Sequence, residues 1–317
     1  MPRIDVEELL RRIRISDVIS RRTKLRRSGR LLKGLCPFHN ERTPSFYVYD
    51  ATDSYYCYGC CAGGDAVDFV MQTDGLSFRA ACEALANGDL PEVSQVEKAK
   101  AREEDKAERA AAIEQARVIW DAAGPLEGSP ARVYLRTRGI EIMPERMRFA
   151  ECYAWINRET GEFGPDLPAL VCAITDVEDV LVGIQRIFLQ PDGSGKSTRL
   201  KVAKLSLGRP AGGAIRLGPA MGDHVIVVEG PEDGATVAQM RPDQPVFVGC
   251  GTGMLPQIKF PAAVRKVTIG GDNNKSGRMA AQRTKAEYQD RGLEVRAVYP
   301  DPDYLDWNDQ LCGKRRK

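Results

Sequence analysis

The spacing of hydrophobic residues changes several times along the chain. Between residues 2 and 20 they recur at roughly helical spacing, which predicts a helix. The next stretch, to residue 58, has short alternating segments bounded by turn residues, which is typical of strands, here 45–49 and 54–57. Two short helical patterns follow, at about 65–71 and 78–86. Together these patterns predict a small module of helices and strands.

A charged, alanine-rich stretch at 95–118 separates this module from the rest of the chain. Between Glu97 and Arg117 it balances six acidic against six basic residues, which is typical of an exposed helix joining two domains. From Trp120 to about Gly222 the pattern is mixed. It predicts a short helix and a pair of strands, at 132–138, 169–175 and 180–189.

From His224 onward, strand and helix patterns alternate. Such alternation predicts a parallel sheet whose strands are joined by crossover helices. The predicted strands are 224–228, 245–249, 264–270 and 293–299, and the predicted helices are about 232–240 and 277–291.

Length and composition set the class of protein. With 317 residues, the chain exceeds the usual size of one domain, so two or three compact units are expected. Its 43% hydrophobic and 28% charged residues are ordinary for a folded soluble protein. No apolar run approaches the roughly 20 residues that span a bilayer, and residues 1–14 lack the apolar core of a signal peptide. We therefore expect a cytoplasmic protein with no membrane partner.

The net charge of +2 is unremarkable, but its distribution is uneven. Residues 1–35 contain eleven Lys and Arg against four Asp and Glu. A basic surface of this kind suits a phosphate backbone. The alternative is a solvated helix face with basic ends.

Two pairs of metal-ligand residues follow this basic region. Cys36 and His39 are separated by two residues, and so are Cys57 and Cys60. Zn²⁺ favours four tetrahedral thiolate or imidazole ligands, and a two-residue spacer lets one turn present both members of a pair. Four protein ligands leave no open position, so we expect one structural zinc ion. Cys61 could compete with Cys60 but breaks the spacing, and the alternative is a set of unligated, reduced cysteines.

Acidic and amide residues follow two of the predicted parallel strands. Glu229 ends the first of these strands, and Asp272 and Asn274 follow the strand at 264–270. Open α/β sheets bind ligands at the carboxyl ends of their strands. Carboxylates gathered there would repel one another unless a divalent cation neutralised them, as in phosphoryl or nucleotidyl transfer. Alternatively, each residue is a helix cap or a turn acid.

The run at 191–198, Pro-Asp-Gly-Ser-Gly-Lys-Ser-Thr, suggests a nucleotide-binding loop but does not fit one. The full pattern requires a glycine five residues before Gly195, where Gln190 stands. The run also follows a strand within an apparent hairpin instead of opening a helix. We therefore reject this interpretation and expect no attached helicase motor of this type.

The stretch from Cys36 to Phe46, followed by Tyr56 to Cys60, resembles the CHC-type zinc domain of bacterial DnaG-type primases. The segments 63–71 and 75–78 are similar to the same family. The resemblance implies a domain that contacts the single-stranded template and helps to choose where primers start. Basic side chains would neutralise phosphates and tyrosines would stack on bases, unless the tyrosines fill a small core. The implied contacts are Arg26, Arg27, Arg42, Tyr47 and Tyr56.

The segments 229–233, 249–253 and 271–281 resemble the Toprim domain shared by DnaG-type primases, topoisomerases and some nucleases. Asn274 stands where that family has a second aspartate; its amide oxygen can bind Mg²⁺ but supplies no charge. The segment 305–309 resembles the Asp-rich segment that closes the site in phage and plasmid primases. The resemblance implies a magnesium site formed by Glu229, Asp233, Asp272, Asn274 and Asp306, with Asp309 as a further candidate.

The region before the Toprim-like segments, from Leu181 to Leu217, resembles the primase core of mobile-element proteins. Alternate residues of its strands share one face, so several basic side chains could point at the acidic site and hold template or triphosphate. A solvated basic hairpin is the alternative. The residues concerned are Arg186, Lys196, Arg199, Lys201 and Lys204.

We therefore expect an α+β multidomain fold in four parts. These are a zinc-ribbon-like domain, a charged helical linker, a basic mixed α+β primase core, and an α/β Toprim domain with a parallel sheet and a basic tail, at 1–92, 93–118, 119–222 and 223–317.

The expected function is that of a DNA-dependent primase of the phage, plasmid or mobile-element kind. This nucleotidyltransferase would make short RNA primers on single-stranded DNA from nucleoside triphosphates. Glu229 and Asp272 would be catalytic with Mg²⁺ or Mn²⁺, and a separate replicative helicase is a candidate partner. Asn274 motivates an alternative, a catalytically weak DNA-binding replication or mobilisation factor. A Toprim nuclease is less favoured, because the zinc domain is associated with primases.

Overall fold

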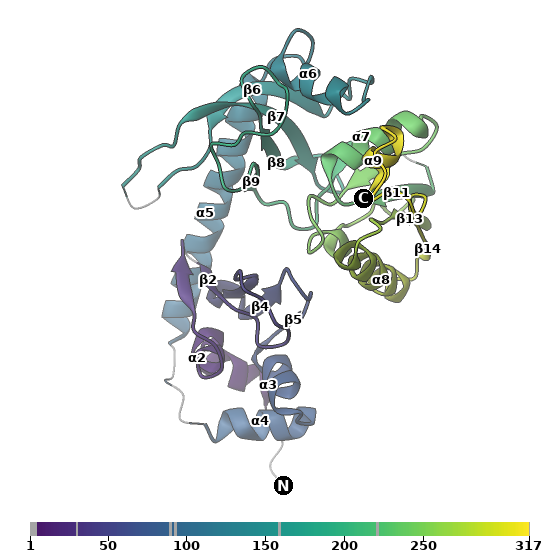
Figure 1. Ribbon diagram of the computed structural model, residues 1–317. Coiled ribbons are helices and arrows are strands. Elements are labelled where there is room, and N and C mark those ends of the chain that lie inside the picture. The colour runs from purple at the N-terminus through teal and green to yellow at the C-terminus, as the bar shows by residue number, and fades with distance from the viewer. Residues whose placement is uncertain are drawn as a thin grey trace. The chain divides into compact units, whose positions relative to one another are not determined.

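The structure is a computed structural model that describes residues 5–29, 31–88, 91, 94–157, 160–219 and 222–316. It divides into two compact units, Met1–Glu108 and Arg109–Lys317 (Figure 1). Among the described residues, the first unit contains one cluster of buried hydrophobic side chains, and the second contains three.

The first unit begins with two short helices, α1 (Val6–Arg12) and α2 (Ile15–Ser20). The single helix predicted over 2–20 is therefore wrong, and its residues 2–4 lie outside the described part of the chain. The break has a physical reason. Ile13 and Arg14 adopt extended backbone angles between the helices, and this turn lets Ile13 and Ile15 both reach the core.

An antiparallel five-stranded sheet follows, and its strands pair in chain order. It consists of β1 (Arg26–Ser28), β2 (Leu31–Gly34), β3 (Phe46–Tyr49), β4 (Ser54–Cys57) and β5 (Gly63–Gly64), with the 3-10 turn Asp50–Thr52 between β3 and β4. The buried side chains of β3 and β4 alternate with half-buried ones, as a two-sided strand requires. The predicted short helices are confirmed as α3 (Ala66–Asp74) and α4 (Phe78–Ala86).

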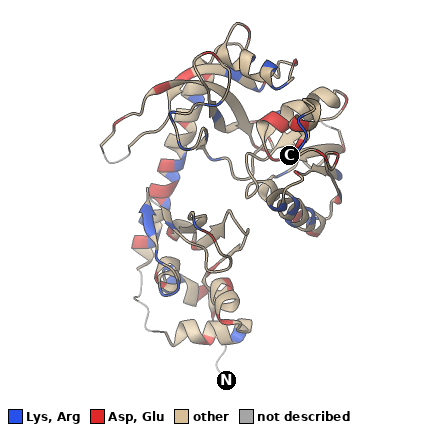
Figure 2. Cartoon of the chain, viewed as in Figure 1, with Lys and Arg blue, Asp and Glu red and all other residues tan. Residues whose placement is uncertain are grey.

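The predicted charged helix is confirmed as α5 (Gln95–Ala122), which crosses the boundary between the units. Acidic and basic residues are interspersed along it (Figure 2). Its first turn is fixed to the first unit, because the Lys98 ammonium group lies 2.8 Å from both the Leu10 carbonyl and the Asp53 carboxylate. Near its other end, Ala116 and Ile119 pack into a core of the second unit.

The second unit contains an antiparallel sheet in the order β6-β7-β8-β9. Its members are β6 (Met147–Tyr153), β7 (Asp166–Thr175), β8 (Leu181–Phe188) and β9 (Lys204–Gly208). One face packs against the end of α5, and the other packs against α6 (Pro130–Thr137). The predicted strand pair at 169–175 and 180–189 is thus part of a larger sheet.

The predicted parallel sheet is confirmed in the last third of the chain. Its order is β10-β12-β11-β13-β14, in which the antiparallel β10 forms one edge. Alternate residues of β11 pack on opposite faces, against α7 and against α8 (Figure 1). The elements are β10 (Ile215–Leu217), β11 (His224–Val228), α7 (Pro231–Met240), β12 (Val246–Val248), the 3-10 turn Leu255–Gln257, β13 (Lys266–Gly270), α8 (Lys275–Asp290), β14 (Glu294–Val298) and α9 (Trp307–Leu311).

Candidate metal centres and nucleic-acid surface

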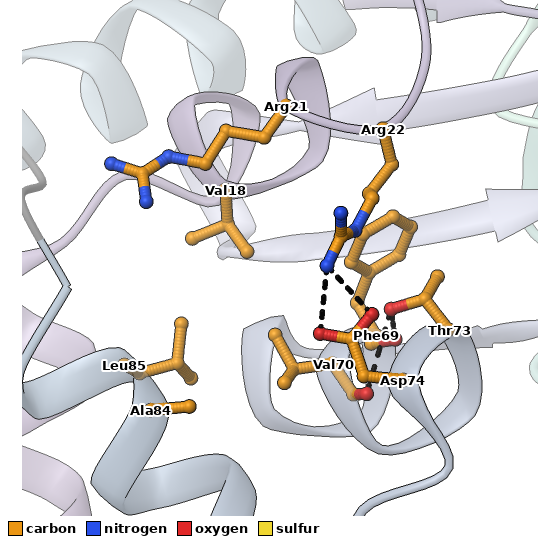
Figure 3. Close-up of a pocket in the computed structure, with 9 residues that line it drawn as sticks. All are labelled: Val18, Arg21, Arg22, Phe69, Val70, Thr73, Asp74, Ala84 and Leu85. Carbon is orange, nitrogen blue, oxygen red and sulfur yellow. Dashed lines mark hydrogen bonds and ion pairs between the residues drawn. The ribbon is translucent and has the colours of Figure 1, made fainter.

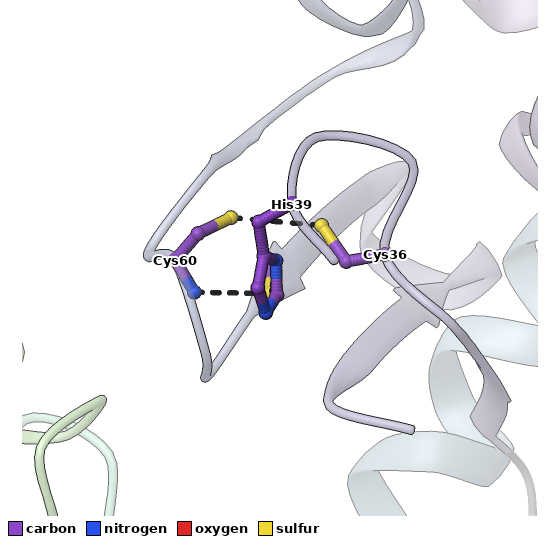
Figure 4. A group of neighbouring side chains, drawn as sticks. Cys36, His39 and Cys60 are labelled. Carbon is purple, nitrogen blue, oxygen red and sulfur yellow. Dashed lines mark hydrogen bonds between the residues drawn. The ribbon is translucent and has the colours of Figure 1, made fainter. Parts of the chain in front are cut away.

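The zinc quartet consists of Cys36, His39, Cys57 and Cys60, whose ligand atoms all lie within 4.8 Å of one another. The Cys36 and Cys60 sulfurs are 3.5 Å apart (Figure 4). The Cys57 sulfur is 3.8 Å from His39 Nδ1. Zinc–sulfur bonds of about 2.3 Å at tetrahedral angles place two sulfurs roughly 3.8 Å apart, so the spacing fits one ion. Cys61 lies outside the quartet; its φ is 59° and its N–H donates to the Cys57 carbonyl.

Glu41 holds two parts of the zinc quartet in place. Its Oε1 accepts hydrogen bonds from the backbone N–H groups of Cys36 and Ser45, at 2.8 and 3.0 Å. Its Oε2 lies 3.4 Å from His39 Nε2, which leaves Nδ1 to face the thiols. A carboxylate on the second ring nitrogen is the usual way to orient a metal-binding histidine. Our sequence analysis missed Glu41, although its position two residues after a histidine ligand was a usable signal.

The three thiols are electrostatically dependent on one another. Contacts with Cys57 and then Cys60, together with burial, raise the pKa of Cys36. The same contact with Cys36 lowers the pKa of Cys57. Three thiolates this close cannot all form without a cation among them, and zinc supplies that charge. The donor set therefore fits one structural zinc ion.

A row of basic and aromatic side chains crosses the face of the first sheet that does not carry the buried side chains of β3 and β4. Arg26 is opposite Lys33, Lys33 is opposite Tyr47, and Tyr47 is opposite Tyr56. Directly opposed residues share a face, and the Lys33 ammonium lies 4.9 Å from the centre of the Tyr47 ring. The Tyr58 ring forms T-shaped pairs with both tyrosine rings. We call this set, Arg26, Lys33, Tyr47, Tyr56 and Tyr58, the tyrosine row.

The tyrosines divide between the two roles that the sequence left open. Tyr55 is fully buried in the core, whereas Tyr47 and Tyr56 are half-buried. Arg42 is exposed in the zinc loop. Arg27 is also exposed, but it is opposite Leu32 and therefore lies on the other face from Arg26. Strand alternation thus separates two arginines that are adjacent in sequence.

Four carboxylates meet in the second unit, and we call them the acidic cluster: Glu229, Asp233, Asp272 and Asp306. Glu229 follows β11, Asp233 lies in the first turn of α7, Asp272 follows β13, and Asp306 precedes α9. Burial and Asp272 raise the pKa of Glu229 to about 7. Burial and Asp306 raise the pKa of Asp272 to about 6. Burial, Asp306 and Asp272 raise the pKa of Asp233.

The acidic cluster is more open than the zinc quartet. Within the described residues, only the zinc quartet brings three or more such ligand atoms within 4.8 Å of one another. Two members of the predicted magnesium site also cap helices. Asn274 accepts a hydrogen bond from Gly277 N–H at the start of α8, and Asp306 accepts one from Asp309 N–H at the start of α9, both at 2.7 Å. Burial and Asp306 raise the pKa of Asp309.

Glu232 joins the basic hairpin to the acidic cluster, and our sequence analysis missed it. Its carboxylate lies 2.6 Å from Lys196 Nζ and 3.6 Å from Lys204 Nζ, and accepts a hydrogen bond from the Tyr134 hydroxyl at 3.0 Å. Burial opposes its ionisation, but Lys204 and Lys196 outweigh burial and lower its pKa to about 2. Lys204 also offsets part of the rise in the pKa values of Glu229 and Asp272, so its charge acts on the acidic cluster.

The remaining basic residues fall into two groups. Arg199 and Lys201 are exposed. Arg186 is only 3% exposed; it donates to the Tyr153 carbonyl at 2.6 Å and packs against the Phe188 ring. The prediction that Arg186 contacts nucleic acid is therefore wrong, because both faces of β8 are covered and residues 183–188 are all buried. Lys196 forms a β-bridge with Leu189, which supports the hairpin and the rejection of a nucleotide-binding loop.

Two hollows lie away from these groups. A cavity of about 240 Å³ between α2, α3 and α4 has Arg22 and Asp74 paired at its rim (Figure 3). It is smaller than most small-molecule sites. A hollow of about 700 Å³ lies beside β10 and β12, where Asp179 lies near Arg146 and Arg216. Neither hollow is lined by a residue of the zinc quartet or the acidic cluster.

Three family models match successive parts of the chain. They are the CHC2 zinc finger over residues 1–101, a domain of unknown function over 110–217, and the Toprim domain over 224–316. The chain is a relative of the DnaG-type DNA primases. It is 38% identical to a Myxococcus xanthus DNA primase over 143 residues, which are 44% of this chain and 23% of that protein. It is 45% identical to the Escherichia coli K12 DNA primase over 86 residues, which are 27% of this chain and 15% of that protein.

The matched regions thus span less than a quarter of either primase. Among solved structures, the zinc-binding and RNA polymerase domains of the Aquifex aeolicus primase are similar, with 21% identity and a TM-score of 0.46 over 99% of this chain and 83% of that one. The predicted α+β multidomain fold, with an N-terminal zinc-binding region and a C-terminal Toprim domain, is confirmed. No helix in the described part of the chain is long and apolar enough to cross a membrane.

Proposed function

We propose that this chain is a DNA-dependent primase, a nucleotidyltransferase that joins ribonucleotides into short primers on single-stranded DNA. The observation that carries the proposal is the acidic cluster at the carboxyl ends of β11 and β13, with two lysines fixed beside it by Glu232. Repelling carboxylates next to fixed ammonium groups suit a reaction that uses a divalent cation and a triphosphate.

In this site, the carboxylates would bind the cation and the basic side chains would bind the phosphates. Glu229, Asp233, Asp272 and Asp306 would hold Mg²⁺ or Mn²⁺, which when bound would neutralise the carboxylates and polarise the triphosphate. Lys196 and Lys204 would bind phosphate oxygens, assisted by the exposed Arg199 and Lys201. The Asn274 oxygen already accepts the Gly277 N–H, so we assign Asn274 to the cap of α8 first and to the cation second.

The tyrosine row would hold the single-stranded template. Arg26 and Lys33 would neutralise phosphates, and Tyr47 and Tyr56 would offer rings to unpaired bases. Arg42 would add a phosphate contact from the zinc loop, whereas Arg27 would reach only a strand that wraps past the edge of the sheet. Zinc would keep β3 and β4 in register, because Cys57 ends β4. A separate replicative helicase is a candidate partner.

Within this proposal we keep the predicted division of the chain into four parts. We also keep the prediction that the chain is a primase of the phage, plasmid or mobile-element kind. In that division, 1–92 recognises template, 93–118 links the domains, 119–222 supplies basic residues, and 223–317 carries the acidic cluster. Residue 317 of the basic tail lies outside the described residues.

Primer synthesis tests the proposal directly. Labelled ribonucleotides, single-stranded DNA and Mg²⁺ or Mn²⁺ should yield short products with wild type and none with Asp272→Ala. Glu229→Gln should lose the products too, because it keeps the shape of the side chain and removes its charge. Asp303→Asn is the matched control, since Asp303 is exposed and outside the cluster. Normal primer synthesis by Glu229→Gln would contradict the assignment.

Asn274 favours one alternative, a catalytically weak DNA-binding factor that keeps the primase fold. An aspartate would cap α8 as well as asparagine does, so Asn274→Asp adds a charge and preserves the helix. A large gain of primer synthesis in this variant would favour the weak factor. Unchanged synthesis would favour an active primase that needs no second aspartate in this loop.

A further inference from the structure

Asn308 is a buried residue of α9 whose polar groups are all engaged. It is 3% exposed. Its backbone N–H donates to Asp233 Oδ1 at 3.0 Å, and its Nδ2 donates to Thr236 Oγ1 and to the Arg138 carbonyl, both at 2.9 Å. Its Oδ1 accepts a hydrogen bond from Arg138 Nη1 at 3.1 Å. Asn308 therefore fixes α9 to α7 and to the end of α6.

The position of α9 determines where Asp306 points. α9 has only five residues, and Asp306 is its N-cap. A helix this short does not form on its own, so its orientation comes from its tertiary contacts. Trp307 adds a further contact, because its indole lies over Gly270, where an added Cβ would meet Trp307 Nε1 at 3.0 Å. Asp306 is thus held from both sides, because the Leu305 carbonyl before it accepts a hydrogen bond from the Asn273 N–H at 2.8 Å.

Arg138 brings a distant part of the sequence to this point. It follows α6, and its guanidinium packs 4.9 Å from the centre of the Tyr134 ring, whose hydroxyl donates to Glu232. The loop after it is tied to α7, because Gln239 donates to the Gly139 carbonyl at 2.9 Å and accepts from Glu141 N–H. Arg138 is therefore connected to Glu232 through the Tyr134 ring and to Asn308 by hydrogen bonds.

We propose that Arg138 and Asn308 form a positioning pair that orients Asp233 and Asp306 toward the divalent cation. Neither residue touches the cation: Asn308 acts on Asp233 directly and on Asp306 through α9, and Arg138 acts by holding Asn308. This inference rests on the proposed function. It assigns a role to the region matched by the domain of unknown function, because Arg138, which lies in that region, supports the metal centre from outside.

Mn²⁺ binding tests the pair without relying on activity. Free Mn²⁺ is measured by electron paramagnetic resonance during titration of the zinc-loaded full chain. Loss of such supporting contacts typically weakens metal affinity by about 10- to 100-fold, so Arg138→Met should weaken Mn²⁺ binding by about 10-fold. Arg138→Lys should recover part of this loss, because a lysine can still donate to Asn308. Arg136→Met is the control, with the same charge change two residues earlier, in α6, at a side chain that is 54% exposed.

The kinetic signature separates positioning from loss of fold. In primer synthesis, Arg138→Met should raise the half-saturating Mn²⁺ concentration by about 10-fold and recover most of its kcat at saturating metal. A merely structural role would lower kcat at all metal concentrations and lower the melting temperature of Arg138→Met and Arg138→Lys alike.

Two results would overturn the proposal in distinguishable ways. Unchanged Mn²⁺ affinity in Arg138→Met, with a wild type whose affinity depends on Asp272, would remove the positioning pair and leave the proposed function intact. A wild-type Mn²⁺ affinity that does not change in Asp272→Ala would remove the metal centre itself, and the pair with it.

Discussion

The zinc quartet and the acidic cluster both gather metal-ligand side chains, but they hold them in different ways. The quartet lies within two short loops, its ligand atoms are all within 4.8 Å, and Glu41 supports it from one side. The acidic cluster draws its members from four separated segments, and Asp306 also caps a helix. Lys204 lies beside it. A closed set of ligands stabilises a fold, whereas an open set leaves room for a substrate.

The largest expected effect is on the folding of the first unit, which should depend on the zinc quartet, whereas the acidic cluster should be unaffected. Cys57→Ser should prevent zinc binding and unfold the first unit, because structural zinc contributes about 10 kcal/mol or more to the folding of such modules. Mn²⁺ affinity in the second unit should change less than twofold. Zinc content and limited proteolysis measure the first effect, with Cys61→Ser as the control. A folded, zinc-loaded Cys57→Ser protein would show that the quartet is not the zinc site.

Without a bound cation, the acidic cluster should instead lower the free energy of unfolding of the second unit. Glu229 and Asp272 have pKa values of about 7 and about 6 when folded, above their unfolded values. The folded state therefore binds more protons between about pH 4 and 7. In EDTA, stability should fall by roughly 6 kcal/mol as pH rises through this window, about 1.4 kcal/mol for each unit by which a pKa differs between the folded and unfolded states.

Urea unfolding of the second unit at several pH values measures this loss. Asp272→Asn should flatten the profile, because it removes one titrating group and one source of the Glu229 shift. Saturating Mg²⁺ should also flatten the wild-type profile. A wild-type stability in EDTA that rises from pH 5 to 7 relative to Asp272→Asn would contradict the repulsion inferred for the cluster.

A smaller effect tests how tightly the zinc loops pack. A Cβ added at Gly59 would lie 2.7 Å from His39 Nε2, so Gly59→Ala should push the ring away from the thiols and from Glu41. We expect zinc affinity to fall about 10-fold, as for other losses of supporting contacts, measured by competition with a chelator. Gly195→Ala is the control, because a Cβ there has no neighbour within 4 Å. Equal zinc affinities would mean that the loop adjusts.

The smallest effect concerns the tyrosine row. Lys33→Ala should weaken binding to single-stranded DNA by a few-fold and reduce the slope of log affinity against log salt by about 0.7, the value for one phosphate contact on a single strand. Fluorescence anisotropy at several salt concentrations measures both. Arg79→Ala removes an exposed charge from α4, away from the row, and should leave the slope unchanged. Equal slopes in Lys33→Ala and wild type would remove Lys33 from the interface.

The two sites also differ in how much the sequence could predict. The quartet is set by spacing within short loops, so four residues were enough to propose it. The parallel sheet followed from alternating patterns, which placed Glu229 and Asp272 at the same edge. Glu232 was missed because its partners Lys196, Lys204 and Tyr134 come from distant segments. The predicted nucleic-acid contact of Arg186 was wrong because its charge suggested exposure, while its position on β8 buries it.

The cap that Asn274 provides has a consequence for how this chain changes over generations. Asparagine and aspartate begin a helix about equally well, and one nucleotide separates their codons. Residue 274 can therefore gain or lose a negative charge beside Asp272 while α8 keeps its first hydrogen bond, at 2.7 Å. Selection can adjust the charge of the acidic cluster at this position without first compensating for a damaged helix. Variation at residue 274 among descendants of this gene would then record changes in metal use, with the architecture held constant.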